Sequence, residues 1–340
     1  MADAGGDRDP VCVTGIGILT AQARGGREAA RELRARVLAG GAGGGAGDLP
    51  LGDVDFPALL GSRGLRHMSR GTLALLAASG LALEDAGLAG ETARDGDATG
   101  VTAGSATATA GLVAEFDRTT LAEGPQAVNP AIFPQTVWNG ASSQVAIRFG
   151  LRGANMTVST GLNSGVDSLL TAVRLIRRGR ARVVLAGGFE EITPFFRVLF
   201  AREAGGAAVR LSEGAAVLVL ERRSAAAARG AGVLATIGAG ASAFEPRPGA
   251  AGTRLRTIVG EVLRAGRCAA PARAWCLGPG AAAAASCPAA VDLDAAAGCG
   301  GGLSGALAAA LAAAGAVSPE LVAATDGAAR VAALLVGPAA

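Results

Sequence analysis

The chain has 340 residues and a mass of 33.0 kDa, enough for one large domain or two smaller ones around a sizeable core. Its 31 basic and 28 acidic side chains give a net charge of +3, too weak a field for us to expect nucleic acid or a membrane as a partner. All basic side chains are arginine, and His67 is the only histidine. Lysine-dependent chemistry is therefore excluded. One histidine is too few for a multi-histidine metal site and makes a histidine-based triad improbable, so we expect no metal or cofactor.

The five cysteines are odd in number and form no C-x-x-C pair; they are Cys12, Cys268, Cys276, Cys287 and Cys299. This pattern indicates neither a disulfide framework nor a zinc site, and a reducing cytoplasm is the compartment it favours. Residues 1–10 carry acidic side chains and no apolar run, so no signal peptide is predicted. The alanine-rich stretch 303–317 is too short to span a membrane and predicts a buried helix.

The first predicted strand covers residues 11–19 and contains Gly15 and Gly17. The letters T-G-I-G could open a dinucleotide-binding turn, but Thr20 stands where that motif needs its third glycine, so no nucleotide site is predicted. The following patterns predict, in chain order, a helix over 28–38, a glycine and alanine loop over 40–47, a helix over 69–86, a strand over 100–105 and a helix over 110–121.

The middle of the chain is the most patterned. Residues 157–160 predict a buried strand that breaks at Gly161, followed by a helix over 164–178 and a strand over 182–186 that ends in Gly187-Gly188. A second series follows, with a strand over 216–221, a helix or turn over 222–229 and a strand over 233–238. Strand, turn, helix and strand in succession build mixed or parallel sheets with helices on their faces, so we expect an α/β fold of two similar halves.

Five ordered segments carry a resemblance to a known family: V-C-V-T-G-I-G-I-L-T (11–20), N-P-A-I-F-P-Q-T-V-W-N (129–139), F-G-L-R-G-A-N-M-T-V-S-T-G-L-N-S-G (149–165), A-R-V-V-L-A-G-G-F-E-E (181–191) and L-S-E-G-A-A-V-L-V-L-E (211–221). The sequence resembles the β-ketoacyl synthases, the condensing enzymes of fatty-acid and polyketide synthesis. The resemblance implies a thiolase-like fold, with two related βαβαβ halves in α-β-α-β-α layers. We divide the chain into 1–210 and a shortened second half, 211–340.

The resemblance also locates the catalytic positions of the family, which this chain does not fill. A cysteine nucleophile belongs at the strand-to-helix elbow, where the helix N-terminus lowers the pKa of its thiol, but Leu162 occupies that place. Two histidines should stabilise the enolate, and their counterparts are Leu277 and Cys299. Asp294 stands where the family has a lysine, and the F-G-F-G-G loop is unrecognisable in 324–337. A leucine cannot accept an acyl group, so the chain is predicted to lack the family's catalysis.

Loss of the whole catalytic set within a retained elbow resembles the chain length factor, the inactive subunit that pairs with an active ketosynthase in type II polyketide synthases. That subunit usually has glutamine at the elbow, so Leu162 marks a divergent member, and a polyene or other highly reducing pathway is one expectation. The resemblance implies two partners: an active ketosynthase in a heterodimer, and acyl carrier protein.

Two other functions stay open. One is a thiolase-fold acyltransferase with a non-standard nucleophile, for which Ser159, Ser164 and Cys299 are candidates, although none has a histidine base to activate it. The other is a scaffold pseudoenzyme that binds acyl carrier protein without shaping a product. Purification together with an active ketosynthase, and analysis of the products, would separate these alternatives from a chain length factor.

In the family the helix over 110–121 lies at the dimer interface and helps to close an acyl tunnel, although its helical spacing is also typical of core. The resemblance thus offers these tunnel candidates: Leu112, Val113, Phe116, Phe133, Phe195 and Phe196. Carrier-protein contacts are expected at an arginine cluster that flanks His67 at the entry to the helix over 69–86, made of Arg63, Arg66 and Arg70. His67 lies within that cluster and is predicted to be a surface or capping residue.

Overall fold

The structure is a computed structural model that describes residues 9–41, 47–90, 96–107, 109–203, 209–278, 281, 285, 287, 289–327 and 329–339. Most of the predicted glycine and alanine loop over 40–47 lies outside the described residues.

The described strands form one continuous sheet. Their bounds are β1 Val11–Thr20, β2 Arg24–Gly25, β3 Thr99–Gly104, β4 Asn155–Val158, β5 Val183–Glu190, β6 Gly214–Arg222, β7 Ala235–Phe244, β8 Arg273–Leu277, β9 Ala290–Asp292, β10 Glu320–Thr325 and β11 Arg330–Pro338. The order is β4-β3-β5-β6-β1-β7-β11-β10-β8-β9, and β2 pairs with β1.

The described helices are α1 Arg27–Leu38, α2 Phe56–Leu60, α3 Arg70–Asp85, α4 Ala110–Glu123, α5 Phe133–Thr136, α6 Gly140–Phe149, α7 Ser164–Arg177, α8 Pro194–Glu203, α9 Arg223–Ala228, α10 Ala251–Ala265, α12 Leu293–Ala297 and α13 Gly302–Gly315. Short 3-10 turns cover Gly96–Ala98, Pro125–Ala127, Pro130–Ile132 and Gly161–Asn163.

The sheet consists of two half-sheets with the same pairing pattern. In the first, β4, β3 and β5 are parallel, and β6 and β1 follow antiparallel. In the second, β9, β8 and β10 are parallel, and β11 and β7 follow antiparallel. The two halves join where β1 pairs with β7 at Cys12 and Val13. The predicted pair of related halves is confirmed, whereas β6, which our division at 210 and 211 assigns to the second half, pairs within the first half-sheet.

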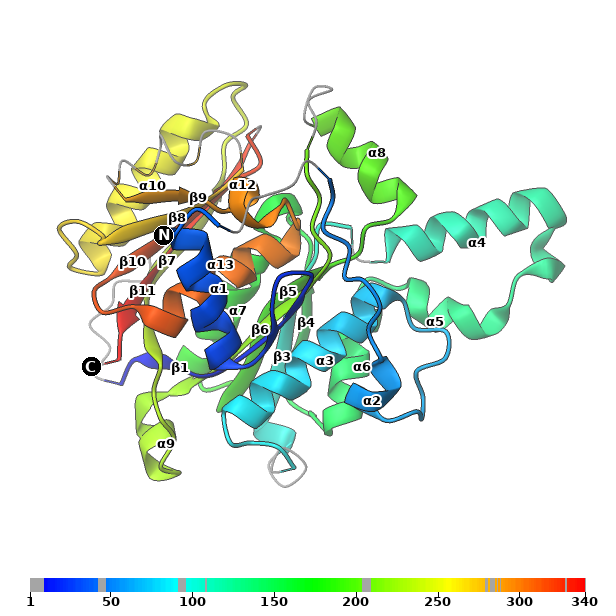
Figure 1. Cartoon of the computed structure of the whole chain (residues 1–340), viewed down its shortest axis with the longest axis horizontal. Coiled ribbons are helices and arrows are strands. Elements are labelled where there is room, and N and C mark those ends of the chain that lie inside the picture. Colours follow the sequence, from blue (N-terminus) through cyan, green and yellow to red (C-terminus); the bar gives the residue numbers. More distant parts are fainter. Residues whose placement is uncertain are drawn as a thin grey trace.

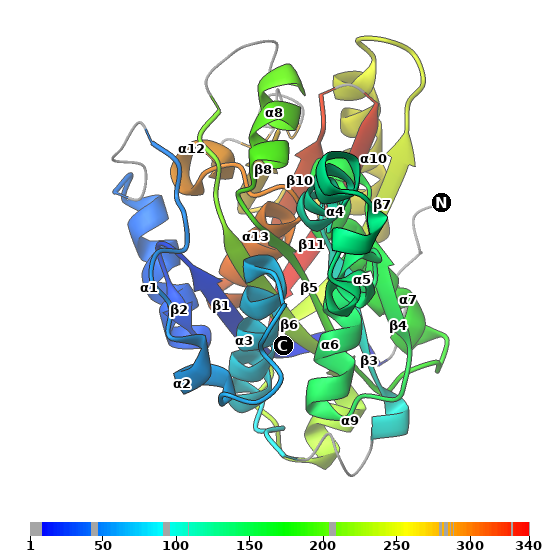
Figure 2. The same cartoon turned by 90° about the vertical axis from the view of Figure 1, so that its right-hand side faces the viewer.

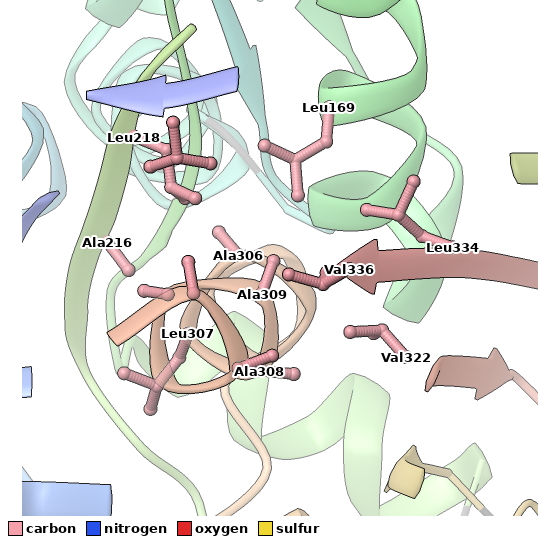
Figure 3. Close-up of a cluster of buried hydrophobic side chains, with 14 of the residues drawn as sticks. Leu169, Ala216, Leu218, Ala306, Leu307, Ala308, Ala309, Val322, Leu334 and Val336 are labelled. Carbon is pink, nitrogen blue, oxygen red and sulfur yellow. The ribbon is translucent and has the colours of Figure 1, made fainter. Parts of the chain in front are cut away.

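Helices and half-sheets alternate in five layers (Figure 1). The α3 and α6 helices cover the outer face of the first half-sheet, α7 and α13 lie between the half-sheets, and α10 covers the outer face of the second. Figure 3 shows Ala306–Ala309 of α13 between Leu218 of β6 and Val322 of β10. The predicted buried helix over 303–317 is thus confirmed as far as Gly315 in α13, whose small side chains let it lie between the half-sheets, whereas Val317 lies beyond the helix and is 90% exposed.

The two central helices begin close to each other. A Cβ added at Gly165, in the first turn of α7, would lie 2.2 Å from the carbonyl oxygen of Gly302, where α13 begins. A side chain at position 165 would therefore push the helices apart. This contact brings the elbow before α7 next to the loop before α13, although more than a hundred residues separate them.

Three local predictions are wrong. Gly187 and Gly188 lie inside β5 instead of ending it. They are glycines because neighbouring backbone is very close: a Cβ at position 187 would lie 2.2 Å from the Ala216 carbonyl oxygen, and one at position 188 would lie 2.0 Å from that of Gly302. The strand predicted over 157–160 is β4, Asn155–Val158, and it is an exposed edge of the described sheet and not a buried strand. The interpretation of the helix over 110–121 as a core helix is wrong, because α4 has no buried residue.

Candidate functional site

The elbow between β4 and α7 is a tight turn held by its own hydrogen bonds. Gly161 has a φ of +68°, a left-handed conformation that favours glycine. The Ser164 hydroxyl donates to the Gly161 carbonyl oxygen at 2.6 Å and accepts from the Thr160 amide at 2.9 Å. Leu162 lies in this turn and is half-buried. The turn retains the geometry that would present a nucleophile at a helix N-terminus, but the side chain presented is a leucine.

The three positions where the resemblance implied catalytic residues converge in space. Leu162 packs against a buried apolar cluster, which we call the elbow cluster: Phe196, Phe200, Leu211 and Cys299. Leu277 ends β8 and is buried with the central helices. A Cβ added at the next residue, Gly278, would lie 3.7 Å from Cδ1 of Leu162. Leu162 and Cys299, two of the positions named by the resemblance, therefore share one apolar cluster, and the residue that follows the third, Leu277, lies close to Leu162.

Asp294 bridges the two loops that follow β8 and α12. One carboxylate oxygen accepts from the Gly278 amide at 2.7 Å, and the other accepts from the Ser304 hydroxyl at 3.1 Å. Ser304 also accepts from the Gly300 amide at 2.9 Å. Burial raises the pKa of the Asp294 carboxyl to about 6. Asp294, for which the resemblance implied a lysine, therefore links the residue after β8 to the first turn of α13.

The alternative nucleophiles are poorly placed for attack. Burial, together with the nearby Asp294 carboxylate, raises the pKa of the Cys299 thiol well above its usual value, so the thiolate is disfavoured. Ser164 is buried and uses its hydroxyl to close the elbow turn. Ser159 is exposed on the other side of Thr160, and the chain's one histidine, His67, is in a surface loop. Among the described residues, none of these serine or cysteine side chains is hydrogen-bonded to a histidine that could activate it.

Glu190 organises the same region, and the sequence pattern assigned it no role. Its carboxyl is fully buried at the end of β5 and accepts from the Ser105 hydroxyl at 2.8 Å, the Ala106 amide at 2.7 Å and the Gly302 amide at 3.1 Å. Burial raises the pKa of this carboxyl. The Glu190 carboxyl thus connects the end of β3 to the N-terminus of α13. In the sequence, its position in the segment 181–191 is the only signal that could have indicated a role for Glu190.

A cavity of about 600 Å³ lies between α4 and α8, beside the first turn of α3. Two of the predicted tunnel residues, Leu112 and Phe195, line it. Phe116 and Phe133 are neighbours on the surface, with ring centroids 6.1 Å apart. Phe196 is fully buried in the elbow cluster. The six tunnel candidates therefore separate into cavity wall, surface and core; Val113, on α4, belongs to the surface group.

Large apolar side chains are exposed on β4, α6, α5 and α4 and between α5 and α6. The α4, α5 and α6 helices lie on the side of the molecule that faces the viewer in Figure 2. We call this surface the apolar face, and its members are Val113, Leu121, Phe133, Val137, Trp138, Ile147 and Met156. It includes the edge of β4 with which no described strand pairs, where Met156 is 43% exposed. Large exposed apolar patches are typical of interaction sites.

The arginine cluster lies at the N-terminus of α3, whose first residue is Arg70. Arg63 and Arg66 are exposed, whereas Arg70 pairs with Glu213 at 3.3 Å and donates to the Gly52 carbonyl oxygen at 2.8 Å. His67 is exposed, as predicted, and has a φ of 71°. Within the described ranges, no group of three His, Cys, Asp or Glu side chains is placed to hold a metal ion, and no helix there is long and apolar enough to cross a bilayer.

Residues 47–226 match the family model described as Beta-ketoacyl synthase, N-terminal domain. The chain belongs to the β-ketoacyl synthase family. It is 34% identical over 184 residues to a 3-oxoacyl-[acyl-carrier-protein] synthase 2 of Rhizobium meliloti (strain 1021), covering 48% of this chain and 43% of the relative. It is 32% identical over 216 residues to the granaticin polyketide putative beta-ketoacyl synthase 1 of Streptomyces violaceoruber, covering 55% of this chain and 51% of the relative. The chain spans about half the length of these relatives.

Solved ketosynthase structures share the whole fold. A structure described as the ishigamide ketosynthase/chain length factor has a TM-score of 0.81 at 23% identity and covers 97% of this chain and 100% of its own. A type II polyketide synthase acyl-carrier protein in complex with its hexaketide-bound ketosynthase, AntDE:AntF, has a TM-score of 0.83 at 18% identity, covering 98% and 100%. The fold of this family member is therefore the thiolase-like ketosynthase fold, as its layers indicate.

Proposed function

We propose that this chain is a non-catalytic, chain-length-factor-like subunit that pairs with an active β-ketoacyl synthase in polyketide or polyene synthesis. Leu162 carries the proposal. It occupies the presenting position of an intact elbow and packs into the elbow cluster instead of leaving space for a thioester. A chain that keeps the elbow turn without any nucleophile has kept the fold for packing and not for acyl transfer.

The partner would cover the apolar face. The edge of β4 offers unpaired backbone groups, and an exposed edge flanked by apolar side chains favours strand pairing with another chain. Pairing there would extend the sheet across the interface and bury Met156 and Ile147. The partner we propose is the active ketosynthase, because two copies of the present chain would make an assembly without a nucleophile. Among the proteins compared, the ishigamide pair combines such subunits.

The growing acyl chain would run along that interface. Leu112 and Phe195 line the cavity between α4 and α8, while Val113 and Phe133 lie on the apolar face with the half-buried Phe116 ring beside Phe133, where a partner would turn them into tunnel wall. Bond formation would occur in the partner, and side chains of this subunit would limit the length of the product. Phe196 is the weakest of the tunnel candidates because the elbow cluster surrounds it.

Acyl carrier protein is the second proposed partner. Arg63 and Arg66 are exposed and have no acidic partner among the described residues, which suits them to an acidic surface. Arg70 already pairs with Glu213, so it would contribute less. The runner-up functions are an acyltransferase with another nucleophile, which the raised pKa of Cys299 disfavours, and a scaffold without influence on the product.

Co-expression tests the proposal. We expect this chain to elute with an active ketosynthase as a stoichiometric complex in size-exclusion chromatography, and to aggregate when it is expressed alone, because the apolar face is then uncovered. A well-behaved monomer that binds no ketosynthase would refute the partner role. A complex whose products do not change when tunnel residues are replaced would favour the scaffold alternative.

A further inference from the structure

Arginines gather at the end of the first half-sheet that lies opposite the elbow, and we propose that this surface binds a carboxylate-rich surface of a protein partner. We call it the arginine edge, and its members are Arg152, Arg178, Arg180, Arg182, Arg222 and Arg223. The inference goes beyond the proposed function and does not depend on it, since it concerns a surface that includes neither the elbow nor the arginine cluster at α3.

The fold brings these arginines together from three separate segments. Arg152 precedes β4, residues 178–182 form the turn from α7 to β5, and residues 222–223 lie where β6 ends and α9 begins. Because β4, β3 and β5 are parallel and β6 is antiparallel to β5, the starts of β4 and β5 and the end of β6 meet at the same end of the half-sheet. The Arg222 guanidinium donates to the Arg177 carbonyl oxygen at 3.1 Å, which connects β6 to the end of α7.

The backbone of this edge is held by hydrogen bonds. The Arg152 amide donates to the Gly96 carbonyl oxygen at 2.7 Å, and the Arg182 amide donates to that of Ala98 at 2.8 Å. One 3-10 turn before β3 thus holds the starts of β4 and β5 on its two sides. The arginine side chains are therefore attached to a fixed backbone, which lowers the entropy lost when a partner binds.

Two carboxylates balance part of the positive charge. Asp97 pairs with Arg152 at 2.6 Å, but both side chains are exposed, so a partner could replace either one at little cost. Asp9 lies next to Arg222, whose guanidinium donates to the Asp9 carbonyl oxygen at 2.7 Å. Six arginines at one edge are a strong concentration of positive charge in a chain whose net charge is +3.

Arg178 and Arg180 indicate the kind of partner. Both side chains are exposed and form no ion pair among the described residues. Guanidinium groups pair with carboxylates through two parallel hydrogen bonds, so a surface rich in Asp and Glu would satisfy them. Single-stranded nucleic acid would also need aromatic rings on which its bases stack. The large exposed aromatic side chains of the described chain lie on or next to other elements; they are Phe133, Trp138, Phe195 and Phe244.

The α7 helix separates the arginine edge from the elbow. Its 14 residues begin at Ser164, directly after the elbow, and end at Arg177, directly before the edge. A helix of this length spans about 21 Å. A partner bound at the arginine edge would therefore leave the elbow side of the molecule free.

Fluorescence anisotropy of labelled poly-L-glutamate tests the inference, with the complex of this chain and its ketosynthase, or with the full chain alone if it is a stable monomer. The native protein should bind the probe at low salt and release it as salt is added. Arg178→Glu combined with Arg180→Glu should weaken binding by about tenfold, because two attractive charges become repulsive. Arg178→Gln combined with Arg180→Gln should weaken binding less, and it keeps the test valid if charge reversal at the end of α7 disturbs folding.

Arg256→Glu combined with Arg264→Glu is the matched control. Both arginines are exposed on α10, and Arg264 lies in its last turn, so the change of charge and the position at a helix end are alike. The control should bind the probe nearly as the native protein does.

Three results would overturn the inference. The first is unchanged binding in the folded variants of the arginine edge, and the second is equal weakening in the control. Loss of binding in Arg63→Glu combined with Arg66→Glu alone would place the probe at the arginine cluster and count as the first result. The third is tighter binding of oligodeoxythymidine than of poly-L-glutamate at the arginine edge, which would assign this surface to nucleic acid instead of a protein.

Discussion

Asp294 shows at the scale of one residue how the site has been rebuilt. Its carboxyl is buried with two hydrogen-bond donors and without a cation among its described contacts, and its pKa is raised from 3.8 to about 6. The folded state therefore holds a proton that the unfolded state releases. The associated stability is fully present below pH 4 and is lost as the pH rises through 6, by about 3 kcal/mol.

Asp294→Asn removes this loss. The amide oxygen can accept from the Gly278 amide and the amide group can donate to Ser304, so the bridge persists without the charge. We expect the variant to have a higher Tm than the native chain at pH 8 and a similar Tm at pH 4.5. Asp53→Asn, at an exposed carboxyl, is the control, and its Tm should stay close to that of the native chain at both pH values. A variant less stable than the native chain at pH 8 would show that the bridge requires the carboxylate.

Leu162→Cys tests whether the missing nucleophile is the whole defect. We expect neither condensation of malonyl units nor a stable acyl adduct, because Leu277 and Cys299 supply no histidine and the surroundings of position 162 are apolar. Intact-mass analysis after incubation with acyl carrier protein or acyl-CoA is the measurement. A ketoacyl product from this variant would mean that the other catalytic positions lie elsewhere.

At the scale of elements, β4 is the proposed line of contact with the partner. Met156→Asp places a charge on its exposed edge, where the fold itself is hardly affected, so the Tm of the variant should change little while the complex with ketosynthase is lost. Size-exclusion chromatography of the co-expressed chains measures the complex. Val317→Asp is the matched control, since Val317 is 90% exposed in the turn between α13 and β10. Equal complex formation by both variants would exclude β4 from the interface.

Phe116 tests the part of the tunnel that α4 would form. Because α4 has no buried residue and the Phe116 ring meets mainly Phe133, Phe116→Ala should cost about 1 kcal/mol rather than the 3 to 5 kcal/mol of a core ring. Co-expression with the active partner should then give longer products at near-normal turnover, as measured by mass analysis. Leu121→Ala, at the exposed end of the same helix, is the control. Unchanged products from an intact complex would remove Phe116 from the tunnel.

Periodicity and glycine placement in the sequence predicted most helices and strands near the site, including α7, α13 and β5. The errors have a common cause, which is contact between distant segments. Gly188 is inside a strand because its neighbour is Gly302, and β4 is exposed because no described strand covers its edge. Glu190 went unassigned for the same reason, since its partners come from β3 and α13. Motif order placed Leu162, Leu277 and Cys299 in the sequence, but only the fold brings them together.

At the scale of the whole molecule, two half-sheets of equal topology enclose the elbow site, where Leu162 and Cys299 lie at positions that the resemblance assigns to catalytic residues. The unpaired β4 edge and the cavity between α4 and α8 both lie outside that site. In our proposal, the β4 edge is the surface for a partner and the cavity is the space for a ligand, whereas the elbow site holds no nucleophile. The account therefore assigns bond formation to another chain.

Native mass spectrometry of the co-expressed complex, after incubation with an acyl donor, tests this assignment most directly. We predict a complex of this chain with one active ketosynthase in which a single acyl group is attached, and dissociation in the spectrometer should place that group on the ketosynthase. An acyl group attached to the present chain would contradict the account. So would an acylated ketosynthase that is never observed in complex with this chain.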